Sequence, residues 1–359
     1  MRLVRMARVP VSEASETIPL LLEGGLVDRT ARIGKAEGSR LVPVAAGMEG
    51  MVAAMGYEIV DGPAHSLDRR PPMERIRERL RGLPEDAVAA LPVKWEYVGD
   101  IVILRLDPCC EPHGSRIGEA YAEVLGAETV CVDTGGIAGD LRRPSIEVIH
   151  GDRTESVRYE NGIGYRFDVR KVMFSSGNNH ERRRMEGLDC RGETVVDMFA
   201  GIGYFTLPLA RFAGPDRVFA CEKNPDSYGF LLENIAINGV ADTVIPILAD
   251  NRDLQGRRFA DRILMGYVQK TSEFLPKALS MIKDGGMIHY HDTLSVRTHA
   301  EDIRSLFEGL CGPDGFAIEA LREVKSFAPH VSHYVADVRI HHTDSPEPHA
   351  VSSVFMASR

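Results

Sequence analysis

The chain has 359 residues, of which 44% are hydrophobic and 26% charged, and its formal net charge is −9. This length exceeds the usual single domain, so two or three folded domains are expected. The negative charge argues against indiscriminate nucleic-acid binding, although a local basic patch remains compatible with RNA. Without an apolar run of roughly 20 residues or a recognisable secretory signal, we expect a cytoplasmic protein without membrane contact.

The first third of the chain predicts two small units. Residues 1–65 form an expected N-terminal domain, in which Ser12–Gly24 is a capped helix and Arg40–Val44 a strand. A linker then leads into the charged helix Met73–Arg81. That helix is either a solvated face with Glu–Arg pairs or an RNA contact, and the first interpretation is favoured.

A middle α+β domain is expected over residues 66–160. It begins with strands between Trp95 and Leu106, continues with a helix over Ile117–Leu125, and returns to a strand at Thr129–Asp133. Beyond it, residues 161–342 repeat a strand, loop and helix with short apolar strands, which is typical of a doubly wound, mostly parallel sheet. Residues 343–359 are expected to form a flexible tail.

One glycine loop carries most of the functional information. The apolar strand Thr194–Asp197 runs into a loop containing Phe199, Gly201 and Gly203, and a helix follows over Tyr204–Phe212. Glycines allow a ligand to approach the backbone closely, because no Cβ atom intervenes. A lone Gly-x-Gly is weak evidence, since turns supply such pairs by chance.

Polar residues at the next two strand ends strengthen the prediction. Glu222 ends the following strand, where a carboxylate accepts hydrogen bonds from ribose hydroxyls, and Asp250 and Asn251 follow the third strand, where they are placed to contact adenine. Thr206 stands where a dinucleotide fingerprint requires a third glycine, so S-adenosylmethionine fits better than NAD. The sequence therefore predicts a class I methyltransferase-like Rossmann domain preceded by smaller α+β domains; the alternative is an ordinary turn with surface carboxylates.

A family resemblance enters at Lys171–Arg184, Lys-Val-Met-Phe-Ser-Ser-Gly-Asn-Asn-His-Glu-Arg-Arg-Arg. This segment resembles the signature of the tRNA guanine-37 N1-methyltransferases and their wyosine-pathway relatives, and the resemblance covers nearly the whole chain. It implies that an N-terminal domain recognises the tRNA body. It also implies that a Rossmann domain acts at the base beside the anticodon.

The chain departs from the methyltransferase pattern at two places. After the fourth strand those enzymes carry Asn and Pro, whereas this chain has Gly266-Tyr267-Val268, and it has Ser176-Gly177-Asn178 where they tend to carry Ser-Pro-Arg-Leu. Both changes resemble the tRNA aminocarboxypropyltransferases of wybutosine synthesis, as do His289-Tyr-His-Asp and Lys325-Ser-Phe-Ala-Pro. Glycine at 266 is expected to leave room for a tricyclic base.

The resemblance implies a specific reaction. The aminocarboxypropyltransferases that the chain resembles move the 3-amino-3-carboxypropyl group of S-adenosylmethionine onto 4-demethylwyosine in tRNA(Phe) and release methylthioadenosine. One alternative is a guanine-37 N1-methyltransferase, and another is a tRNA-binding protein that does not catalyse a reaction. We expect a monomer with tRNA(Phe) as its partner and no metal.

The resemblance also assigns residues. It implies that Ser175 and Arg182 contact the cofactor, and Arg182 is a candidate partner of the methionine carboxylate. With Arg182, the candidate catalytic residues are Glu181, as a base or orienting carboxylate, and Tyr267, as a stacking surface for a flipped base. The alternative for Arg182 is a place on a solvated arginine face of the helix. For Glu181 it is an exposed pair with a nearby arginine, and for Tyr267 it is a place in the core. His289 and His291 alternate along a strand, so both are expected to point to the same face. They are interpreted as an active-site wall or as part of the core, rather than as a metal site.

Overall fold

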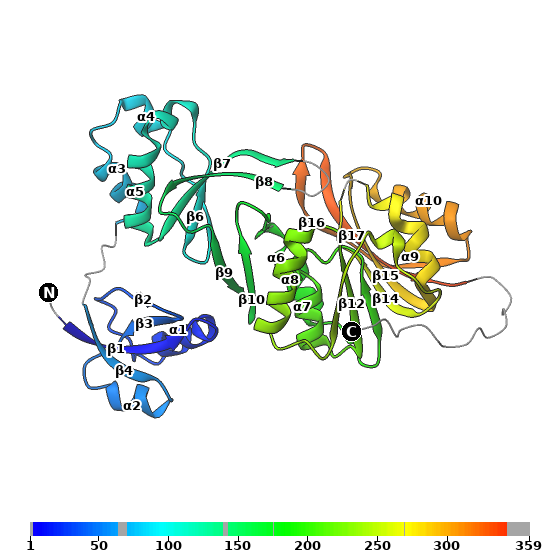
Figure 1. The fold of residues 1–359 in the computed structure, drawn as a ribbon, viewed down its shortest axis with the longest axis horizontal. Coiled ribbons are helices and arrows are strands. Elements are labelled where there is room, and N and C mark those ends of the chain that lie inside the picture. Colours follow the sequence, from blue (N-terminus) through cyan, green and yellow to red (C-terminus); the bar gives the residue numbers. More distant parts are fainter. Residues whose placement is uncertain (1–2, 64–69, 139–142, 175, 269, 343–359) are drawn as a thin grey trace.

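The computed structural model describes residues 3–63, 70–138, 143–174, 176–268 and 270–342, which form three parts (Figure 1). In these ranges no helix is long and apolar enough to cross a membrane. The predicted flexible tail lies outside the described residues.

The N-terminal part is a four-stranded antiparallel sheet in the order β2-β3-β1-β4, with two short helices. The predicted helix is α1, which begins later than expected and has no side-chain cap, and the predicted strand is β3. Val9, Leu21 and Val42 lie in its small core. The elements are β1 (Leu3–Pro10), α1 (Ala14–Glu23), β2 (Gly34–Ala36), β3 (Ser39–Pro43), α2 (Glu49–Ala54) and β4 (Glu58–Pro63).

The middle part is a second four-stranded sheet, in the order β5-β6-β7-β8. Strands β6 and β7 are parallel because helix α5 crosses between them, and the outer pairs are antiparallel. The elements are α3 (Pro72–Arg79), α4 (Glu85–Ala89), β5 (Glu96–Val98), β6 (Ile101–Leu104), α5 (Gly114–Leu125), β7 (Thr129–Ala138) and β8 (Arg143–His150).

The charged helix α3 pairs its arginines with nearby acids. Arg79 bonds Glu123 of α5 at 2.7 Å, and Glu78 accepts from Arg70 at 2.7 Å, while Ile76 is buried. These contacts support the solvated-face interpretation of this helix. Exposed pairs of this kind contribute little to stability, because solvent screens the charges.

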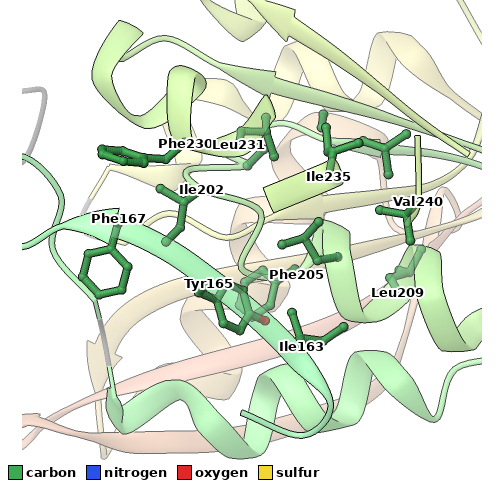
Figure 2. Close-up of a cluster of buried hydrophobic side chains, with 14 of the residues drawn as sticks. Ile163, Tyr165, Phe167, Ile202, Phe205, Leu209, Phe230, Leu231, Ile235 and Val240 are labelled. Atoms are coloured by element: carbon green, nitrogen blue, oxygen red, sulfur yellow. The ribbon is translucent and has the colours of Figure 1, made fainter. Parts of the chain in front are cut away.

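A hairpin of β9 (Glu155–Glu160) and β10 (Ile163–Asp168) links the middle and C-terminal parts, and the domain boundary expected at 160 falls at its turn. Strand β10 pairs with β9 along one edge. Along its other edge, asparagine side chains at helix α8 bond the backbone of β10, as a neighbouring strand would do. Asn238 bonds the backbone N–H and carbonyl of Gly164 at 2.9 and 2.8 Å, and Asn234 bonds those of Arg166 at 2.7 and 3.1 Å. Figure 2 shows side chains of β10 and α8 in one buried apolar cluster, which includes Tyr165, Ile202 and Leu231.

The C-terminal part is a seven-stranded sheet in the order β13-β12-β11-β14-β15-β17-β16. The first five strands are parallel, and β17 and β16 add an antiparallel edge. Its strands are β11 (Thr194–Asp197), β12 (Arg217–Glu222), β13 (Val244–Leu248), β14 (Ala260–Met265), β15 (Ile282–Ser295), β16 (Phe316–Ala328) and β17 (Val331–Ile340). The mostly parallel sheet that the sequence predicts is confirmed.

Helices cover both faces of this sheet (Figure 1). They are α6 (Asn179–Glu186), α7 (Thr206–Pro208), α8 (Pro225–Ile237), α9 (Leu275–Met281) and α10 (His299–Cys311). The helix predicted over Tyr204–Phe212 begins at Thr206 and changes to a π-helical turn over Leu209–Ala213. Regular i→i−4 bonds from Leu207 to Gly203 and from Leu209 to Phe205 flank Pro208, so the wider turn begins only after the proline.

Candidate active site

A cavity of about 570 Å³ opens at the carboxyl ends of β11, β12, β13 and β14. In a parallel sheet these ends lie on one edge, so loops that are far apart in the sequence meet there. The antiparallel strands β16 and β17 complete the wall with Lys325 and His333. The cavity is therefore formed partly by the glycine loop that the sequence predicts and partly by β16 and β17, which contain no such motif.

The glycine loop adopts a conformation that only glycine accommodates easily. Gly201 has φ +57°, and a Cβ there would lie 2.6 Å from the ring of Tyr204. Gly203 has φ +101°, and its missing side chain makes room for Leu207 rather than bordering the cavity. One glycine thus borders the cavity and the other allows the helix behind it to pack.

Glu222 organises the loop through both of its carboxylate oxygens. Oε2 accepts from the N–H of Gly201 at 2.7 Å, and Oε1 accepts from the N–H of Asn224 at 2.6 Å. Each oxygen has a second lone-pair site, so the carboxylate can still accept from a ligand. Burial raises the pKa of Glu222, and the backbone N–H groups oppose that rise only in part.

Asp197 supports the same loop, although it is not among the site residues predicted from the sequence. Its carboxylate is fully buried and accepts from the N–H of Phe199 at 3.1 Å and from the hydroxyl of Thr206 at 2.7 Å. Burial raises the pKa of Asp197 to about 6. Its place at the end of the motif strand, directly before the glycine loop, was the signal that could have identified it.

Asp250 and Asn251 differ in how their polar atoms are used. Asp250 accepts from Arg252 through both oxygens, at 2.9 and 2.6 Å, and these bonds lower the pKa of its carboxyl group. Asn251 is 5% exposed and donates to the carbonyl of Met198 at 2.9 Å, while its Oδ1 has no hydrogen-bond partner among the described residues. A buried acceptor beside a cavity is placed to receive a ligand donor.

Aromatic rings form one side of the cavity. Phe199 stacks on Tyr267 with ring centroids 5.0 Å apart, and Phe274 meets both rings edge-on. The guanidinium of Arg252 lies 5.3 Å from the ring centre of Phe274. Phe199 thus covers one face of the Tyr267 ring. The expected role of Tyr267 in stacking on a base stays a prediction.

An aromatic ring lies where a side chain at position 266 would begin. A Cβ at this position would lie 2.6 Å from the ring of Phe205, which itself stacks on His291 at 5.3 Å. Gly266 also borders the cavity, so the expectation that glycine leaves room there for a tricyclic base stays a prediction. At the same time, glycine permits close approach of the Phe205 ring to the strand end.

Arg182 is 2% exposed but borders the cavity. Its guanidinium donates two hydrogen bonds to Glu160, at 2.6 and 3.0 Å, and lies 4.7 Å from the ring centre of Phe174. The structure thus gives it a structural partner in the hairpin, and its contact with the cofactor stays a prediction. Ser175 lies outside the described residues.

Glu181 and two histidines form a buried polar row at one wall of the cavity. Glu181 pairs with Arg184, and its Oε1 lies 3.6 Å from Nε2 of His291. The Nδ1 atom of His291 lies 3.0 Å from Nε2 of His333. His291 and His333 border the cavity, whereas Glu181 lies behind them.

His289 occupies the same strand face but belongs to the core. It bonds Asp337 at 2.5 Å and Arg262 at 2.8 Å, so its ring is held between β17 and β14. The predicted shared orientation of the two histidines of β15 is confirmed, since both face helix α6. Within the described ranges no group of three or more His, Cys, Asp or Glu side chains is arranged to hold a metal ion.

Comparison with known proteins places this geometry in a family. Residues 156–319 match the TRM5/TYW2 methyltransferase domain, and residues 76–154 match the TYW2 N-terminal domain. The tRNA(Phe) (4-demethylwyosine(37)-C(7)) aminocarboxypropyltransferase of Pyrococcus horikoshii is 46% identical over 269 residues, which are 74% of this chain and 96% of that protein. The chain belongs to the TRM5/TYW2 family. The resemblance seen in the sequence is thereby confirmed.

Further members of the TRM5/TYW2 family are similar to this chain in sequence and in structure. The tRNA (guanine(37)-N(1))-methyltransferase Trm5b of Pyrococcus abyssi is 33% identical over 341 residues, covering 93% of this chain and 98% of that protein. The crystal structure of P. horikoshii TYW2 in complex with MeSAdo matches with a TM-score of 0.68 and 43% identity, covering 76% of this chain and 100% of that one. The predicted class I fold is confirmed, and the roles of individual site residues remain predictions.

Proposed function

We propose that this protein transfers the 3-amino-3-carboxypropyl group of S-adenosylmethionine to 4-demethylwyosine at position 37 of tRNA(Phe), releasing methylthioadenosine. One observation carries this assignment: the P. horikoshii enzyme of that name is 46% identical and matches over 96% of its own length. Among the similar solved structures, P. horikoshii TYW2 is in complex with MeSAdo and M. jannaschii TYW2 is in complex with AdoMet. The chain is therefore an S-adenosylmethionine-dependent transferase.

The residues of the cavity fit S-adenosylmethionine. The unpartnered Oδ1 of Asn251 offers an acceptor for an amino group, and the second lone pairs of Glu222 offer acceptors for ribose hydroxyls. The Phe199–Tyr267 pair gives the nucleoside an apolar wall. When bound, the sulfonium makes its attached carbons electrophilic, and the carbon that reacts is the one held in line with the nucleophile.

Selection of the reacting carbon depends on how the protein holds the methionine moiety. Arg182 is fixed by Glu160 and by the ring of Phe174, so its orientation is set before any ligand binds. A fixed guanidinium at the cavity edge suits a carboxylate partner. We propose that Arg182 and Ser175 hold the methionine chain, and that Tyr267 meets the acceptor base.

The tRNA partner fits a basic rim around the cavity. Lys171 and Lys270 are exposed and border the opening, and Lys325 lies deeper in the wall. These cations are local, because the chain as a whole has a net charge of −9. We propose a cytoplasmic monomer that contacts tRNA through this rim.

The second candidate is a tRNA guanine-37 N1-methyltransferase. One observation favours it: the P. abyssi methyltransferase matches 93% of this chain, whereas the P. horikoshii aminocarboxypropyltransferase matches 74%. The N-terminal sheet precedes both matched family domains, which begin at residue 76. The higher identity and the Gly266-Tyr267 replacement nevertheless favour the aminocarboxypropyltransferase.

Product analysis tests the assignment directly. Incubation with S-adenosylmethionine and tRNA(Phe) carrying 4-demethylwyosine should add the aminocarboxypropyl mass to the base and yield methylthioadenosine. The same tRNA with unmodified guanine at position 37 is the matched control and should remain unchanged. A methylated guanine together with S-adenosylhomocysteine would establish the second candidate instead.

Salt dependence tests the basic rim. Binding to tRNA should weaken with rising salt, and Lys171→Ala and Lys270→Ala should each lower the slope of log affinity against log salt by about 0.7–0.9. Arg81→Ala is the control, because Arg81 lies in the middle part beside Glu78 and away from the cavity. Filter binding over a salt series measures these slopes, and a wild-type affinity that ignores salt would contradict the proposed contact.

A further inference from the structure

We propose that His333 accepts the proton lost by the acceptor ring when the new carbon–carbon bond forms, with His291 and Glu181 as positioning residues behind it. This inference rests on the proposed aminocarboxypropyl transfer. Substitution at a ring carbon requires a proton to leave that carbon. The roles proposed above for the cavity residues do not include removal of this proton. The geometry of three side chains from three different elements points to His333.

The three side chains form a row that ends at the cavity. Glu181 lies on α6, His291 on β15 and His333 on β17. Oε1 of Glu181 is 3.6 Å from Nε2 of His291, whose Nδ1 is 3.0 Å from Nε2 of His333. His333 is only 3% exposed, and its side chain borders the cavity.

This row specifies a tautomer. A carboxylate beside Nε2 of His291 favours a proton on that nitrogen, which leaves His291 Nδ1 as an acceptor. His333 must then donate from Nε2, and its Nδ1 keeps a lone pair. No hydrogen bond to Nδ1 of His333 occurs among the described residues, so this atom is the basic end of the row.

The step balances in atoms and electrons. A ring-carbon electron pair forms the bond to the methylene next to sulfur, and the carbon–sulfur pair leaves with sulfur as neutral methylthioadenosine. The ring then carries one positive charge. Nδ1 of His333 takes the proton from the substituted carbon, the carbon–hydrogen pair returns to the ring, and the imidazolium later releases its proton to solvent.

The surroundings keep His333 in the basic form. Burial, assisted by Lys325, lowers its pKa to about 4, and burial together with His333 lowers the pKa of His291 well below its usual value. Other charged or titratable groups near the pair are Glu181 and Arg184 from α6, His289 from β15 and Arg322 from β16. The rate should therefore show no rise between pH 6 and 8 from His333, and should fall only as the pH approaches about 4.

The test compares His333→Gln with the wild type on an acceptor deuterated at the reacting carbon. Gln retains a donor for His291 but has no base, so kcat should fall by roughly 10²–10⁴-fold, while the Kd for S-adenosylmethionine stays within about twofold. Proton removal should then become rate-limiting, so the deuterium effect on kcat should increase. Added imidazole should restore part of the rate of His333→Ala, but not of His291→Gln.

The control is His299→Gln, because His299 stacks on Tyr334 with centroids 4.1 Å apart and lies outside the cavity. Its kcat and deuterium effect should match the wild type. An unchanged kcat in His333→Gln, or an unchanged deuterium effect without imidazole rescue, would overturn the role of His333. If His333→Gln does not bind S-adenosylmethionine, His333→Asn takes its place. A wild type that yields no aminocarboxypropyl product would instead refute the underlying function.

Discussion

Replacing Glu222 with alanine should weaken S-adenosylmethionine binding by roughly 5–150-fold, because loss of a buried acceptor costs about 1–3 kcal/mol. The carboxylate does two things at once: it accepts from the N–H of Gly201 and from that of Asn224, and it faces the cavity. Its removal therefore loosens the loop and removes the expected ribose contact together. Isothermal titration calorimetry measures the change in Kd.

Asp250→Ala is the informative comparison. Its oxygens already bind Arg252, so part of its cost will appear as loss of that pair rather than as lost ligand contact. We expect at least several-fold weaker binding, with the larger effect at Glu222. Because burial raises the pKa of Glu222, wild-type affinity should fall on acidification at a higher pH than for an ordinary glutamate. Unchanged affinity in both variants would refute this binding site.

Arg182→Ala should lower the free energy of unfolding by about 3 kcal/mol, because it leaves the buried carboxylate of Glu160 without its two-bond partner. This lies at the lower end of the range for such losses, since Arg158 remains 3.4 Å from Glu160. The ring of Phe174 would also lose one of the two guanidinium groups beside it. Urea unfolding followed by circular dichroism measures the loss.

The double variant Arg182→Met with Glu160→Gln separates the two roles of Arg182. Removing both charges should recover much of the stability, because no unpaired buried charge remains. If Arg182 also holds the methionine carboxylate, the recovered protein should still bind S-adenosylmethionine more weakly than Glu160→Gln alone. A stability loss below about 1 kcal/mol in Arg182→Ala would show that the buried pair contributes little.

Local signals explain why much of the fold was predictable. The strands that form the middle of the sheet are short apolar runs, and Val195, Val196, Ile263 and Leu264 are buried as such runs require. The loop after β11 needs glycine at 201 for its positive φ, which leaves a visible mark in the sequence. The change to a π-helical turn at Leu209 was not predicted, because the apolar pattern is the same for both helices.

By itself, the sequence determined the Rossmann class, the glycine loop and the acidic strand ends, because each depends on neighbouring residues or on regular spacing. Only the tertiary structure decided that the ring of Phe205 packs closely against Gly266 and that Glu160 holds Arg182. It alone brought His333 next to His291, since these residues lie 42 positions apart on separate strands. Such contacts depend on how strands pair and side chains pack, and no local pattern in the chain encodes which distant residue becomes the neighbour.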